Sequence, residues 1–160
     1  MKKVILFLFV ALALSCGGND DNPSANFTAT TVLDGDPFEP VSGVYAESAP
    51  DMHRRYIFQM QESGAGNASM SIELFVPFSQ QEFTGNYNMG IGEADDALAN
   101  VYLNKAGTTY NISSDNLLRV TDLGNSRFRF EFIDGYAIVF QGDPVPFSGV
   151  IEGRFEPADN

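Results

Sequence analysis

The chain has no tryptophan, one cysteine and one histidine among its 160 residues. A single cysteine cannot form an intramolecular disulfide, and one cysteine with one histidine cannot supply the ligands of a zinc site. Basic residues are also scarce, because nine Lys and Arg stand against 21 Asp and Glu and the net charge is −12. A strongly acidic chain repels phosphate backbones, so we expect no nucleic-acid partner.

Catalytic motifs are missing as well. The sequence has no Gly-x-Ser-x-Gly elbow and no glycine-rich phosphate loop between a strand and a helix. His53 lies in a polar stretch before an alternating run, and we interpret it as a surface residue where a strand begins. We therefore expect no enzyme, no catalytic residue and no cofactor. A carboxylate-based hydrolase is a distant alternative. Such an enzyme needs two acidic side chains close together, and a chain with this many acidic residues always offers some pair.

The N-terminus has the order of an export signal. Two lysines precede eleven apolar residues, Val4–Leu14, which are followed by Ser15 and Cys16. This order resembles a bacterial lipoprotein signal, although Ala13 occupies the position where the family pattern has leucine. The resemblance implies that residues 1–15 are removed and that the Cys16 thiol is acylated. The alternatives are an ordinary secretory signal and a transmembrane helix, but eleven residues rise only about 16 Å as a helix.

The segment after the cysteine predicts a disordered acidic tether over residues 16–26. It contains no apolar side chain larger than Ala or Pro, so it cannot bury a core. Its acidic residues, Asp20 and Asp21, resemble the spacers of Bacteroidetes lipoproteins, in which such residues accompany outward display on the outer membrane. Solvation of a linker explains them equally well. We expect an envelope protein that is anchored to the outer membrane through its acyl chain. Both the cell-surface face and the periplasmic face of that membrane are compatible with the sequence.

Residues 27–156 predict a single all-β domain, with a tail at 157–160. Turn residues recur between short alternating runs, which indicates about ten strands in an antiparallel sandwich or barrel-like fold. Asp34-Gly35 predicts a two-residue hairpin turn, and Arg55–Gln61 is expected to pair with Met70–Val76. Only Gly90–Leu98 has any helical character, and we expect a loop with one turn there.

The C-terminal third predicts a meander of Leu117–Thr121, Arg127–Ile133 and Tyr136–Gln141. A three-residue loop at 123–125 would set Val120 opposite Phe128 and keep the apolar side chains on one face. Asp134-Gly135 would form the second turn. We expect Phe128, Phe130 and Phe132 in the core, and either bulges or close backbone approach at Gly149 and Gly153.

Four markers recur in order: the opening Phe27–Phe38, the step Gly85-Asn86-Tyr87, the strand Leu118–Asp122 and the closing Gly153-Arg154-Phe155. With these markers the chain resembles small β-rich lipoprotein domains of unknown function in Bacteroidetes. The resemblance implies a sandwich or barrel-like fold and a lipid anchor. It implies no activity and provides no functional residues.

Two acidic groups invite comparison with calcium loops: Asp34, Asp36 and Glu39, and Glu93, Asp95 and Asp96. Neither has the spacing of a known calcium loop, so we expect turn chemistry and no metal. Phe75, Tyr102 and Tyr110 are possible exposed platforms for a carbohydrate or peptide, and the alternative is a second core.

These observations favour a non-enzymatic binding or interaction module whose ligand, a protein or a glycan, is unknown. A structural envelope lipoprotein without a soluble ligand is the alternative.

Overall fold

The structure, a computed structural model, describes residues 26–48, 53–64, 68–90, 96–114, 117–139 and 141–158. Within these ranges it forms thirteen strands and no helix. Their bounds are β1 (Phe27–Ala29), β2 (Val32–Leu33), β3 (Asp36–Pro37), β4 (Ser42–Ser48), β5 (His53–Gln61), β6 (Ser69–Pro77), β7 (Gly85–Met89), β8 (Leu98–Lys105), β9 (Thr108–Ser114), β10 (Leu117–Gly124), β11 (Arg127–Ile138), β12 (Val145–Arg154) and β13 (Glu156–Pro157).

The predicted all-β, barrel-like fold is confirmed. Three of the strands, β2, β3 and β13, have only two residues each, which is too short for an alternating pattern to reveal. The sheet is also not purely antiparallel, because β7 pairs with β8 in parallel and β13 pairs with β4 in parallel. The expected single turn in Gly90–Leu98 falls mostly on residues 91–95, which lie outside the described ranges.

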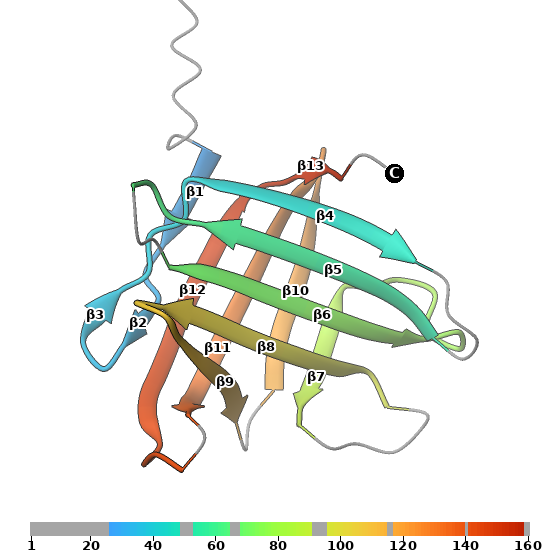
Figure 1. Cartoon of the computed structure of the whole chain (residues 1–160). Coiled ribbons are helices and arrows are strands. Elements are labelled where there is room, and N and C mark those ends of the chain that lie inside the picture. Colours follow the sequence, from blue (N-terminus) through green and yellow to red (C-terminus); the bar gives the residue numbers. More distant parts are fainter. Residues whose placement is uncertain are drawn as a thin grey trace, which may run out of the picture.

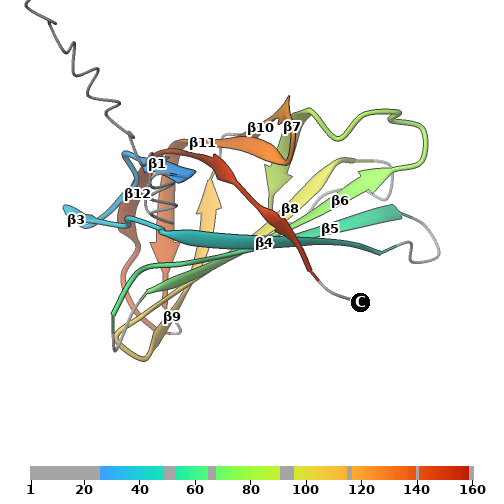
Figure 2. The same cartoon turned by 90° about the horizontal axis from the view of Figure 1, so that it is seen from above.

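The strands form two layers that join at both sides. β4, β5, β6 and β8 make one layer, and β10, β11 and β12 cross behind it at a steep angle (Figure 1). On one side β9 pairs with both β8 and β11, and β7 pairs with both β8 and β10. On the other side β13 follows β12 directly and pairs with β4, and Figure 2 shows this crossing from above. The hydrogen-bonded ring is therefore closed, and the apolar face points inward.

The hairpin of β5 and β6 has the predicted partners and faces. Tyr56 lies opposite Leu74, and Phe58 lies opposite Ile72. All four side chains are buried, with exposed fractions of 8% or less. Since side chains alternate along a strand, the residues between them face outward.

The register of β10 and β11 differs from our prediction by two residues. Val120 lies opposite Phe130, where the sequence predicted Phe128. The tight turn is Asn125–Ser126, with φ of 52° and 59°, and these left-handed values are typical of a two-residue hairpin. The extra residue is accommodated in a bulge between Asp122 and Gly124. A shift of two keeps every side chain on its face, so Phe128, Phe130 and Phe132 are buried as predicted.

The predicted turn at Asp134-Gly135 is wrong, because β11 continues through it to Ile138. The register shifts between Phe132 and Gly135, and Asp134 has a φ of 46°. Along one edge β11 pairs with β12 both before and after this bulge. Along its other edge it pairs with β10 before the bulge and with β9 after it. A Cβ on Gly135 would lie 2.9 Å from the Phe147 carbonyl oxygen and 3.3 Å from that of Ser113. The glycine signal thus marks close backbone approach within a long strand.

The close backbone approach predicted at Gly149 is confirmed, because a Cβ there would lie 2.5 Å from the Cα of Thr31. At Gly153 the close contact is with a side chain instead, because a Cβ there would lie 2.1 Å from the Phe27 ring. Both glycines therefore allow β12 to lie against the N-terminal residues of the described chain. The Asp34-Gly35 turn is also present, with Leu33 opposite Asp36.

Candidate functional site

The outer face of the β4, β5, β6, β8 and β9 layer carries two rows of uncharged side chains. The strand registers define the rows, since each residue lies directly opposite the next. The first row is Ser42, Gln61, Ser69, Asn104 and Thr109, and the second is Val44, Gln59, Ser71, Tyr102 and Asn111. Successive residues of a strand face opposite sides, so these rows lie behind the buried face of the same strands.

A hollow lies over these two rows and extends across the strands, with β6 at its centre. Ser69 and Ser71 are small and form its floor, while longer side chains on the two neighbouring strands form its walls. Gln59 and Gln61 stand on the β5 side, and Tyr102 stands on the β8 side together with Asn104. The hollow has a volume of about 410 Å³, which lies within the usual range of ligand sites. We call these six residues the β6 trough.

The polar groups of the β6 trough are available to a ligand. Within the described ranges, none of the six side chains forms a hydrogen bond to another protein group, and none of the residues lining the hollow is charged. Together they present three amides and three hydroxyls, each a donor and an acceptor. The chain has a net charge of −12, yet no charged residue lines this hollow.

Of the three aromatic platforms considered from sequence, only Tyr102 lies in the trough. Its exposed fraction is 39%. Phe75 faces outward farther along β6, but it is half-buried and the Arg55 guanidinium lies 5.9 Å from its ring centroid. Tyr110 packs against the core. Arg55 also pairs with Glu73 at 2.7 Å, so charged groups begin just beyond the trough.

A second hollow of about 260 Å³ lies between the β4–β5 layer and the β10–β11 turn. Five aromatic rings line it, and their neighbouring centroids are 5.0 to 6.4 Å apart. They belong to Tyr45, Tyr56, Phe58, Phe83 and Phe128. These contacts are typical of core packing. The hollow also contains two carboxylates, which belong to Glu47 and Asp122.

Both carboxylates have protein partners. The backbone N–H of Gly124 donates to Asp122 at 2.7 Å, within the bulge. Burial raises the pKa of Tyr56, and so does its hydrogen bond to Glu47. Tyr87 lies nearby, fully buried, and its hydroxyl donates to the Phe83 carbonyl oxygen. Burial raises its pKa too. These bonds fix strand ends and turns, and they give both carboxylates of this hollow a partner within the protein.

Those of the acidic residues singled out from sequence that the structure describes are absent from the lining of both hollows. Asp36 pairs with Lys105 at 3.6 Å, and the Glu39 amide donates to Glu62 at 2.9 Å. The Asn88 amide donates to Asp96 at 3.3 Å, while Glu93 and Asp95 lie outside the described ranges. Among the residues that are described, no three His, Cys, Asp or Glu side chains gather as metal ligands would.

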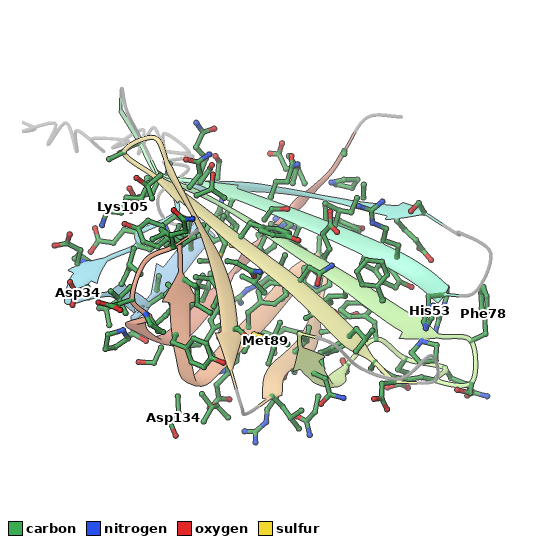
Figure 3. The ribbon with its side chains drawn as sticks, turned by 60° about the horizontal axis from the view of Figure 1, so that its bottom comes forward. Asp34, His53, Phe78, Met89, Lys105 and Asp134 are labelled. Atoms are coloured by element: carbon green, nitrogen blue, oxygen red, sulfur yellow. The ribbon has the colours of Figure 1, made fainter. Side chains whose placement is uncertain are left out.

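His53 is the first residue of β5, opposite Pro77, and is half-buried. Figure 3 shows it beside Phe78, at the end of the layer away from Lys105 and Asp34. It is therefore remote from the β6 trough, whose Asn104 precedes Lys105.

Cys16 lies outside the described residues. In the part of the chain that is described, no helix is long and apolar enough to cross a membrane.

Comparison with known proteins finds no family model, no curated protein and no solved structure that matches the chain. The resemblance to Bacteroidetes lipoprotein domains thus stays a prediction, and a binding role has to be inferred from the geometry of the site.

Proposed function

We propose that this chain is a lipid-anchored lipoprotein of the cell envelope and that its β domain is a non-enzymatic binding module. The observation that carries the binding role is the β6 trough, a hollow of about 410 Å³ lined by uncharged residues. Six side chains with free donors and acceptors converge there, and a few converging polar groups are what orients a ligand in a pocket. A ligand of this surface is uncharged where it touches the protein.

The N-terminal sequence supports the anchor. Lys2 and Lys3, the apolar run Val4–Leu14 and the small residue before Cys16 have the order of a bacterial lipoprotein signal. In this proposal the acylated Cys16 holds the domain at the outer membrane, and the acidic tether separates the domain from the lipid surface. A structural lipoprotein without a soluble ligand is the second candidate, and it needs no accessible trough.

Two measurements test the proposal. Mass spectrometry of the detergent-extracted protein should find a diacylglyceryl group and a blocked amine on Cys16, and an unmodified thiol would contradict the anchor. For binding, the full ¹⁵N-labelled chain is mixed with fractions of envelope extract. Amide shifts confined to β4, β5, β6 and β8 at the trough support a binding module. If no fraction shifts these amides, the structural role is the better one.

A further inference from the structure

The chemistry of the β6 trough identifies a class of ligand. We infer that the trough binds a neutral glycan chain, with Tyr102 as the stacking platform for one sugar ring. This inference rests on the proposed binding function and specifies its ligand.

The first reason is the kind of polar group that the trough presents. Its amides and hydroxyls both donate and accept, and none of them is charged. Hydroxyl groups of a sugar also donate and accept, so they match such a surface, whereas a phosphate or carboxylate needs cationic partners. Arg55 faces the same side of β5, but it is already paired with Glu73 at 2.7 Å and lies over Phe75.

The second reason is Tyr102. Its ring is 39% exposed and stands at the wall of the trough, directly opposite Ser71. The face of an aromatic ring is electron-rich, and the C–H groups on one face of a pyranose are weakly positive. The two faces therefore stack, while the hydroxyls at the ring edge reach the neighbouring amides.

The third reason is shape. The floor lies between β5 and β8, which are separated by two strand spacings or about 10 Å. The residues that line the hollow come from five neighbouring strands, β4, β5, β6, β8 and β9, so the hollow extends across the sheet. A short run of sugar rings that lies across the strands fits such a trough. A peptide would gain its affinity at an open strand edge, but β6 is hydrogen-bonded on both sides, to β5 and to β8.

Affinity electrophoresis of the detergent-extracted full chain tests the ligand class. The gels contain dextran, soluble starch, laminarin, yeast mannan or xylan as neutral probes, and polygalacturonate or heparin as anionic probes. We expect retardation by at least one neutral polysaccharide and by neither anionic one. Retardation by the anionic probes alone, or by none of the neutral ones, would overturn the glycan inference.

Variants place the binding in the trough. Tyr102→Ala should weaken binding about tenfold, since stacking is lost, and Tyr102→Phe should retain it. Ser71→Arg should abolish binding because a long side chain covers the floor. The matched control is Phe78→Ala, which removes an aromatic side chain that is 58% exposed at the far end of β6. Equal binding by Tyr102→Ala and Phe78→Ala would contradict the site. Unchanged circular dichroism spectra and urea midpoints show that each variant is folded.

Two further experiments distinguish a failure of the glycan inference from a failure of the proposed binding function. Periodate cleaves sugars that have vicinal diols, and dilute acid hydrolyses the glycosidic bonds of 1→3-linked chains that lack them, so envelope fractions are tested before and after each treatment. Amide shifts at the trough that disappear after either treatment support a glycan, whereas shifts that persist after both refute the glycan and leave the binding module in place. Light scattering tests a second copy as occupant. A dimer that Ser71→Arg dissociates would overturn the glycan inference.

Discussion

Phe58 on β5 and Phe130 on β11 meet edge to face, with ring centroids 5.0 Å apart and an interplanar angle of 69°. Both side chains are fully buried, and they come from the two layers that cross in Figure 1. Phe155 lies edge to face against both rings, with centroids 5.3 Å from Phe58 and 5.9 Å from Phe130. This cluster joins the layers at the centre of the core.

Replacement of Phe130 should therefore destabilise the whole domain. Phe130→Ala removes a buried ring and leaves a cavity, so we expect a loss of about 3–5 kcal/mol in the free energy of unfolding. Urea titration measures it. Leu123→Ala, on a side chain that is 45% exposed in the β10 bulge, is the control and should change stability by less than about 0.5 kcal/mol. Equal losses in the two variants would contradict the core assignment.

The turn between β10 and β11 contains an unfavourable residue. Ser126 has a φ of 59°, a left-handed value that costs a residue with a Cβ about 1–2 kcal/mol. Ser126→Gly creates an Asn-Gly turn, the preferred pair for this geometry. We expect it to raise the free energy of unfolding by about 1 kcal/mol. Ser71→Gly, in the middle of β6, is the control and should lower the free energy of unfolding. An increase in that variant would show that the left-handed conformation of Ser126 does not explain the stabilisation.

Gly149 has a φ of 130° and no room for a side chain, because a Cβ there would lie 2.5 Å from the Cα of Thr31. Gly149→Ala forces two backbone segments apart, and we expect a loss of about 3 kcal/mol. Gly107 is the matched comparison, since its φ is also positive but nothing lies within 4 Å of the place that a Cβ would occupy. Gly107→Ala should cost only about 1 kcal/mol. Thermal unfolding of the two variants measures the difference, which should vanish if contact with Thr31 is unimportant.

Alkaline pH should destabilise the protein through Tyr87. Burial raises the pKa of its hydroxyl above the ordinary value of 10.0. Above about pH 10 the unfolded chain releases this proton while the folded chain keeps it, so the free energy of unfolding falls as pH rises. The maximum slope from one such group is about 1.4 kcal/mol per pH unit. Below this window the group contributes no pH dependence.

Urea midpoints between about pH 8 and pH 11.5 test this prediction. Tyr87→Phe removes the ionisable group but also its hydrogen bond to the Phe83 carbonyl oxygen, so its midpoint at the lower pH should be reduced. In the alkaline range, the urea midpoint of this variant should fall less steeply with pH than the midpoint of the unchanged protein. Parallel declines would assign the alkaline sensitivity to other groups.

Much of the local structure could be predicted from the sequence because it depends on neighbouring residues. The alternation in β5 and β6 predicted their pairing and their buried faces. Side chains that alternate with the buried set, such as Gln59 and Ser71, face outward, but nothing in their local sequence distinguishes them from ordinary solvent-facing residues. Their role emerged only when β8 lay beside β6 and brought Tyr102 opposite Ser71. β6 and β8 are separated by the whole of β7, and no local pattern specifies that contact.

The sequence by itself determined the all-β class, the inward faces of the strands, the Asp34-Gly35 turn and the uncharged character of individual outer positions. These follow from side-chain period, turn chemistry and composition. The tertiary structure decided the β10–β11 register, the course of β11 through Gly135 and the trough. Each depends on non-local pairing, in which a shift of two residues preserves every face and a glycine serves either a turn or a close approach. Only packing between distant strands selects one of these solutions, and only that packing gathers scattered polar residues into a site.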